Sequence, residues 1–301
     1  EQERPERWAG AGEKLVAGLK AFAAEKQGPL RSYLDEARAA GLVEAYTPFW
    51  IFNGFALKAR PGAIRQIASH PSVSVILLDH YRQWLVGEEA SPESAEWNIE
   101  RIRAPEVWAS LGVSGTGAVV AVMDTGADWL HPALMSNYRG YNPHGPAVHT
   151  GNWFDPVTGS IYPFDDHGHG THVLGIAVGG GGIGVAPGAK WIAVKVLNGD
   201  GYGYDSWIHA GFQWLLAPGG DPSLAPDVVN CSWGDTNALN TVFQADLRAL
   251  RAAGIVPVFA AGNGGPSPAS VYSPASLPEA IAVGATDPYD EVAPFSSRGP
   301  S

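Results

Sequence analysis

The chain has 301 residues, of which 45% are apolar and 16% charged, and its formal net charge is −11. This composition excludes a disordered chain and supplies enough apolar side chains for one large core or two smaller ones. No apolar run reaches the roughly 18 residues that a membrane-spanning helix requires, so no membrane span is expected. The single cysteine, Cys231, excludes a disulfide framework or a cysteine zinc site.

Charge is distributed unevenly along the chain. Residues 1–87 carry 11 Lys and Arg against 9 Asp and Glu, whereas residues 88–301 carry 8 against 21. The acidic remainder makes nucleic acid an unexpected partner, and the opposite signs would help the front part dock on the rest. Solubility alone explains the acidity equally well.

The front part of the chain has the pattern of a small α+β unit. Helical spacing of apolar residues predicts helices over residues 8–27 and 33–40, the second ended by Gly41. Strands are predicted over residues 46–52, 55–59 and 73–86, with a helix over 61–70 that Pro61 opens. The acidic, Ser- and Pro-bearing segment 87–96 is a predicted linker, which divides the chain into units of residues 1–90 and 91–301.

The second unit alternates strand and helix patterns. Apolar β-type runs occupy residues 118–123, 191–197, 228–232, 255–260 and 280–285, and helical patterns occupy residues 171–178, 205–216 and 239–253. This alternation predicts an α/β fold with a doubly wound parallel sheet that is covered on both faces.

Three polar residues are expected to meet at one edge of this sheet. Asp124 directly follows one predicted strand, Asn263 follows another by three residues, and His169 opens a helix between two strands. Ligand sites of open parallel sheets gather at the carboxyl ends of the strands. A carboxylate that holds one imidazole nitrogen fixes the tautomer and leaves the other nitrogen to take a hydroxyl proton. Asn263 would then direct its amide NH₂ at an oxyanion.

The motifs around these residues carry a family resemblance. From about residue 97 onward the chain resembles the subtilase family of serine peptidases, in its bacillopeptidase F type, through VVAVMDTGAD, DDHGHGTHVLG, FAAGNGG and FSSRGPS. The resemblance implies a subtilisin-like fold in which Asp124 orients the base, His169 is the general base and Asn263 donates to the oxyanion. It also implies a secreted endopeptidase that acts on proteins or peptides through an acyl-enzyme.

The resemblance further implies a substrate cleft and a propeptide. One edge of the cleft would be Gly201, Tyr202 and Gly203, and the facing edge Ser232, Trp233 and Gly234, with an extended peptide between them as an added strand. Large apolar side chains are expected near the cleaved bond. Residues 1–90 resemble, more weakly, a ferredoxin-like inhibitor-type propeptide, whose tail occupies the cleft until it is cut. The alternative is a permanent accessory domain.

The nucleophile is not identified in the sequence. The family's serine lies in a GTS-type motif a few tens of residues beyond an FSSRGP-like segment, and no GTS tripeptide occurs here; Ser296, Ser297 and Ser301 lack that context. The chain is therefore expected to stop before its nucleophile and to be inactive as written. The alternative from another functional class is a non-catalytic peptide-binding or inhibitory protein on a protease scaffold.

Metal and cofactor sites receive weaker support. His167, His169 and His172 with Asp165 and Asp166 resemble a metal cluster, but their spacing is not HExxH and the subtilase resemblance accounts for His169 without metal. No cofactor is expected to be required. Calcium is possible for stability, although Ala133 and the loop GGGGIGVAPG lack the acidic or amide ligands of the family's common strong site.

Overall fold

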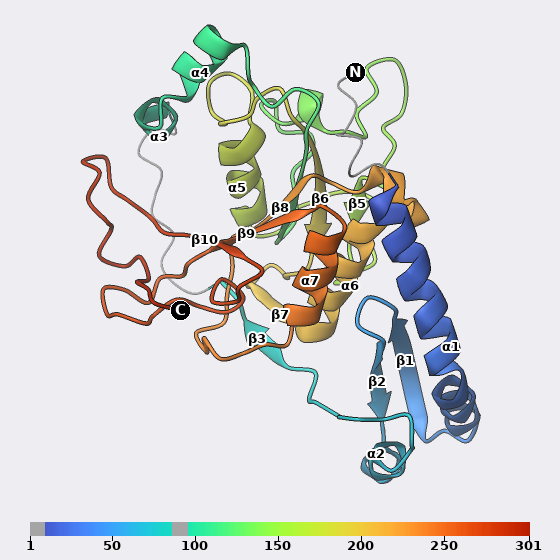
Figure 1. Cartoon of the computed structure of the whole chain (residues 1–301). Coiled ribbons are helices and arrows are strands. Elements are labelled where there is room, and N and C mark those ends of the chain that lie inside the picture. The colour runs from blue at the N-terminus through green and yellow to red at the C-terminus, as the bar shows by residue number, and fades with distance from the viewer. Residues whose placement is uncertain (1–9, 86–95) are drawn as a thin grey trace.

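The computed structural model describes residues 10–85 and 96–301 (Figure 1). The predicted linker and the boundary between the two units fall almost entirely at residues 86–95, outside the described residues. None of the helices in the described ranges is long and apolar enough to cross a membrane.

A six-stranded sheet forms the centre of the second unit. All its strands are parallel, in the order β10-β9-β8-β4-β6-β5. They are β4 (Val119–Asp124), β5 (Trp153–Phe154), β6 (Lys190–Lys195), β8 (Val228–Cys231), β9 (Val256–Ala260) and β10 (Ile281–Val283). Five of these strands coincide with the five predicted apolar runs: β8, β9 and β10 are shorter than predicted, β4 is shifted by one residue, and β6 begins one residue earlier and ends two residues earlier. The two-residue β5 was not predicted, because so short a pairing leaves no period in the sequence.

The sheet separates two cores, as a doubly wound fold requires. Ala121 and Met123 of β4 face one core, and Val122 faces the other, because successive side chains of a strand point to opposite faces. Helices α6 (Asp205–Leu216) and α7 (Gln244–Ala252) cover the first core, and α5 (His169–Val178) covers the second (Figure 1). The predicted fold class is therefore confirmed.

Shorter elements connect these layers. They are α3 (Glu96–Arg101), α4 (Ala104–Leu111), η2 (Met135–Asn137), β7 (Tyr202–Tyr204), η3 (Pro218–Gly220) and η4 (Pro222–Leu224). Only α6 matches its predicted bounds; the prediction for α7 began five residues too early.

The front unit begins with one long helix, where two were predicted. Helix α1 (Ala11–Ala39) continues through Pro29. The preceding Gly28 has no Cβ, which removes part of the clash that a proline imposes on the residue before it. Beyond the proline the helix buries Leu30 and Leu34 in a small core with the following strands. Tertiary packing therefore overrides the helix break that the sequence indicated.

The rest of the front unit departs further from the prediction. Strands β1 (Val43–Phe49) and β2 (Gly54–Ala59) form an antiparallel hairpin, followed by α2 (Pro61–Ala68). The strand predicted over residues 73–86 is wrong for residues 73–80, which form no strand and leave Leu77 and Leu78 exposed. Only β3 (Tyr81–Gln83) forms, and it pairs with β7 of the second unit. In the described residues the sheet of the front unit itself has two strands, β1 and β2. The ferredoxin-like fold of this unit therefore stays a prediction.

The burial of α7 gives a direct test of the first core. We expect Leu247→Ala to lower the free energy of unfolding by about 2–5 kcal/mol, because the side chain is fully buried and its removal leaves a cavity. The same substitution at Leu239, which is 87% exposed, should change it by less than about 0.5 kcal/mol. Denaturant titration of both variants measures the difference; equal effects would contradict this packing.

Candidate active site

Asp124 and His169 meet at the carboxyl end of the sheet. Asp124 is the last residue of β4 and is completely buried, and His169 is the first residue of α5. The His169 Nδ1 lies 2.7 Å from the Asp124 Oδ1, which also accepts the backbone N–H of Thr125 at 2.7 Å. The Asp124 Oδ2 is buried and has no hydrogen-bond partner in the described part of the chain. A carboxylate so poorly solvated stabilises a positive charge on the adjoining imidazole.

Two glycines permit this approach of helix to strand. A Cβ on Gly170 would lie 2.2 Å from the Gly126 carbonyl oxygen and 3.2 Å from the Asp124 Cβ. Gly126 has a φ of +134°, and a Cβ there would lie 2.1 Å from the Phe164 carbonyl oxygen. The motifs DTGAD and HGTHV therefore need these glycines, because the backbone after β4 touches the helix at Gly170 and the preceding loop at Phe164.

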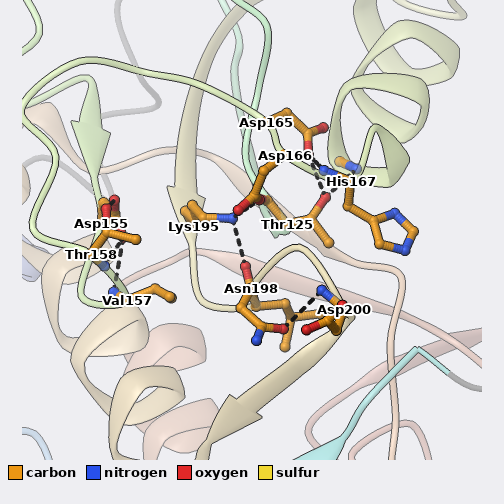
Figure 2. Close-up of polar contacts among 12 residues, drawn as sticks. Thr125, Asp155, Val157, Thr158, Asp165, Asp166, His167, Lys195, Asn198 and Asp200 are labelled. Carbon is orange, nitrogen blue, oxygen red and sulfur yellow. Dashed lines mark hydrogen bonds and ion pairs between the residues drawn. The ribbon is translucent and has the colours of Figure 1, made fainter.

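Asp165 ties the loop before α5 to the end of β4. Its Oδ1 accepts the Thr125 hydroxyl at 2.9 Å, and the same hydroxyl oxygen accepts the Gly170 N–H at 2.9 Å. The carboxylate also accepts the backbone N–H of His167 (Figure 2). It accepts the backbone N–H groups of Gly168 and Thr171 and the Thr171 hydroxyl as well. Burial raises the pKa of Asp165, but the hydrogen bonds from Thr171, Gly168 and His167 outweigh it, so the net shift is downward.

Lys195 also stabilises the loop before α5 and the end of β4. Its ammonium is fully buried at the end of β6, and it donates to the Asp166 carboxylate (Figure 2). It also donates to the carbonyl oxygens of Thr125 and Leu197. The lysine thus joins the ends of β4 and β6 to the loop that carries His169.

Sequence reasoning missed the supporting roles of Thr125, Asp165 and Lys195. Asp165 entered it only as a possible metal ligand. A signal was present for Lys195, because a charged residue inside the apolar run WIAVKVL is almost never buried without a partner.

Asn263 lies in an exposed turn three residues beyond β9. Ser297 holds this turn: its N–H donates to the Gly262 carbonyl at 2.9 Å, and its hydroxyl accepts the Gly264 N–H at 3.0 Å. Ser296 is likewise buried, and its hydroxyl accepts the Ala285 N–H. Both serines therefore hold the backbone of this region in place.

The two predicted cleft edges enclose an extended segment of the front unit. Strand β3 pairs antiparallel with β7, which contains Tyr202 and Gly203. The Trp84 N–H donates to the Gly201 carbonyl at 3.0 Å, and the Gly234 N–H donates to the Trp84 carbonyl at 3.1 Å. Residues 81–85, here called the tail segment, thus lie as an added strand between the edges.

Trp84 fills an apolar pocket of this cleft. Its side chain is buried, its Nε1 donates to the Gly203 carbonyl at 3.1 Å, and its ring meets that of Trp233 edge-on at 5.4 Å. Trp233 is itself anchored, because its Nε1 donates to the Met123 carbonyl of β4. Tyr202 stacks on Tyr81 of the tail segment at 5.5 Å. The hydroxyl of Ser232, by contrast, accepts the amide of Asn230 in its own unit at 2.9 Å.

Residues 115–301, well over half the chain, match the model of the subtilase family. The chain belongs to the subtilase family. Bacillopeptidase F of Bacillus subtilis (strain 168) is 41% identical over 318 residues, which cover 95% of this chain and 22% of that protein. Subtilisin E of the same organism is 35% identical over 260 residues, 83% of this chain and 60% of that protein. Subtilisin of Bacillus pumilus is 38% identical over 216 residues, 69% and 70% of the two chains. The chain thus spans about a fifth of bacillopeptidase F and 60% of subtilisin E.

Subtilase membership accords with the pairing of Asp124 and His169 at this edge of the sheet. The described residues contain no group of three or more His, Cys, Asp or Glu side chains arranged to hold a metal ion.

The contact of α5 with β4 can be tested with two alanines on one helix. We expect Gly170→Ala to push α5 away from Gly126, lower the free energy of unfolding by about 1–3 kcal/mol and remove the downfield proton resonance of the His169 Nδ1–H. Gly175→Ala, where a Cβ would meet nothing within 4 Å, should retain that resonance and leave stability unchanged or raised by up to about 1 kcal/mol. An unperturbed resonance in Gly170→Ala would refute the argument.

The lowered pKa of Asp165 predicts a pH-dependent contribution to stability. A carboxyl whose folded pKa lies below its unfolded value of about 3.9 stabilises the fold above that value, and loses this effect as pH falls through the folded pKa. Asp165→Asn should therefore cost about 1.5–3 kcal/mol near pH 7 and progressively less below pH 4. Unfolding titrations across pH measure this, with the exposed Asp200→Asn as the control, for which little change is expected at any pH.

Proposed function

We propose that this chain is the precursor of a serine-type endopeptidase, which hydrolyses peptide bonds through an acyl-enzyme. The observation that carries the proposal is the 2.7 Å contact between the buried Asp124 carboxylate and the His169 Nδ1. With Nδ1 held in this way, the imidazole presents Nε2 as the general base toward a serine hydroxyl, and then as the acid toward the leaving amine.

The remaining catalytic groups follow from the family. The Asn263 amide would donate to the oxyanion that develops on the attacked carbonyl. We assign no nucleophile among the 301 residues, and we propose that they are inactive by themselves. Catalysis would need no cofactor, and calcium, if bound, would serve stability.

We further propose that residues 1–90 are an inhibitor-type propeptide of the peptidase unit 91–301. The tail segment supports this, because it pairs with β7 and accepts the Gly234 N–H as a bound substrate strand would. A substrate strand would have to displace the tail segment from these edges. Maturation would then require a cut between residues 85 and 96.

Proteins or peptides are the proposed substrates, with large apolar side chains near the cleaved bond. The Trp84 pocket, walled by Trp233 and Phe243, supports this preference. The resemblance to the subtilases also implies that the protein acts outside the cell.

Activity of the extended enzyme tests the proposal. We expect the 301 residues alone to cleave no protein substrate, and the same chain extended by a subtilase segment that carries the GTS-type serine to cleave it. In the extended enzyme His169→Ala should remove nearly all turnover, by up to about 10⁶-fold, and Asn263→Ala should lower it by about 10²–10³-fold, the magnitudes seen in this family. Turnover is measured with internally quenched peptides.

Two results would contradict these roles. Unchanged turnover in Asn263→Ala would remove it from the oxyanion site. An extended protein that binds peptides but cleaves none would favour the non-catalytic peptide-binding alternative.

A further inference from the structure

The tail segment presents two side chains toward the same wall of the cleft. Because residues two apart in a strand share a face, Arg82 and Trp84 point together into the peptidase unit. The Arg82 guanidinium stacks over the Trp84 ring at 5.1 Å. We infer that the cleft contains a charge-selective subsite, formed by Asp205 and Asp235, that binds a substrate arginine two residues before an aromatic side chain.

The carboxylates of Asp205 and Asp235 bind the Arg82 guanidinium from opposite edges of the cleft. Asp205 directly follows β7 and begins α6, whereas Asp235 directly follows the edge Ser232–Trp233–Gly234. The Arg82 Nη2 donates to the Asp205 Oδ2 at 3.1 Å, and its Nη1 donates to the Asp235 Oδ2. The side chains of the two aspartates are 6% and 11% exposed, so the charges interact with little solvent screening.

Asp235 is set in place by its own unit. Its Oδ1 accepts the Asn237 N–H at 3.0 Å, its Oδ2 accepts the Asn240 amide at 2.9 Å, and its backbone bonds to Ser273 in both directions. This half of the subsite is therefore preformed, and its position does not depend on the tail segment.

Asp205 depends on the cation that faces it. In the described part of the chain its carboxylate contacts only Arg82 and His80, both from the front unit, and its Oδ1 is buried without a hydrogen-bond partner. Burial raises the pKa of Asp205, and the charges of Arg82 and His80 offset only part of this effect, so the net shift is upward. When the front unit leaves, two carboxylates face one another across the cleft with no cation between them. A substrate cation at the same place relieves their repulsion.

Arginine fits this subsite better than lysine. Its planar fork reaches two carboxylates at once, and its face stacks on an aromatic ring, whereas a lysine ammonium is a compact point charge. The preferred ligand is thus an extended peptide with the sequence Arg-x-aromatic. This inference rests on the proposed function, since it describes the substrate of the same cleft.

The experiment compares peptides that differ at one position. Internally quenched peptides containing Xaa-Gln-Trp-Leu, with Xaa as arginine, lysine, norleucine or glutamate, are given to the extended, matured enzyme. We expect kcat/KM to fall in that order, with arginine at least about tenfold above norleucine, which has a similar length and no charge. Equal values for arginine and norleucine would overturn the inference and leave the proposed peptidase function intact.

Matched variants locate the effect. The double variant Asp205→Asn, Asp235→Asn should reduce the arginine-to-norleucine ratio to near one. Asp200→Asn removes an exposed carboxylate from the neighbouring loop and should keep the wild-type ratio. A ratio that survives in the double variant would place the selectivity elsewhere and reject this subsite.

A binding measurement keeps the inference testable if the extended enzyme cleaves nothing. The 301-residue chain with Arg82→Ala and Trp84→Ala, which weaken the hold of its own tail segment, is titrated against fluorescent forms of the same peptides. The arginine peptide should bind at least about tenfold more tightly than the norleucine peptide, as measured by anisotropy. Equal affinities would reject the subsite independently of any catalysis.

Discussion

The site depends on how closely the first turn of α5 approaches the end of β4. The Asp124 side chain is short and fully buried, so the imidazole must come close to it. The helix comes within reach because Gly170 has no side chain to keep it away from the Gly126 carbonyl. Asp165 then fixes the approach by accepting hydrogen bonds from both partners, from Thr125 on one side and Thr171 on the other. A pair that must hold a proton at one atom is thereby fixed both by backbone contact and by the hydrogen bonds of Asp165.

Much of this site was predictable from local sequence. Asp124 and Asn263 each follow an apolar run, and the rule that parallel strands end at one edge is enough to place them on the same side of the sheet. The position of His169 was harder to predict, because only its flanking glycines and threonine indicate that its loop returns to that edge of the sheet. The supporting residues were harder to find, because Asp165 and Lys195 act through contacts between segments that are distant in the sequence, and such contacts leave no period.

The front unit shows where sequence patterns fail and why. Two helices were predicted over residues 8–27 and 33–40, but packing on both sides of Pro29 keeps a single helix. Residues 73–80 have the composition of a strand, yet a strand also needs an edge to pair with, and in the described structure the paired strand begins only at residue 81. The edge they reach belongs to the other unit, so the strand's position follows from the cleft and not from its own sequence.

The interface between the two units is mainly apolar, although the charge distribution of the sequence indicated electrostatic complementarity. Val16, Phe49, Ile51 and Trp84 lie in the same core as Phe212 and Leu247 of the peptidase unit. The ring of Phe52 also covers His209 at 4.4 Å, above the buried contact of His209 Nδ1 with the Asp246 Oδ2 at 3.0 Å. Among the described residues the ion pairs across this contact gather at Arg82 and His80, which face Asp205 and Asp235.

Apolar burial therefore supplies most of the affinity of the front unit for the peptidase unit. The free energy of apolar burial is proportional to the area removed from water and is not weakened by salt. The ion pairs do something different: they set the register of the tail segment, since a one-residue slip would carry Arg82 away from both carboxylates and turn Trp84 out of its pocket. The contacts of Arg82 and Trp84 that fix the register of the tail segment are also those that a substrate must reproduce. The front unit therefore occupies the cleft with the same Arg-x-aromatic sequence that the cleft binds in a substrate.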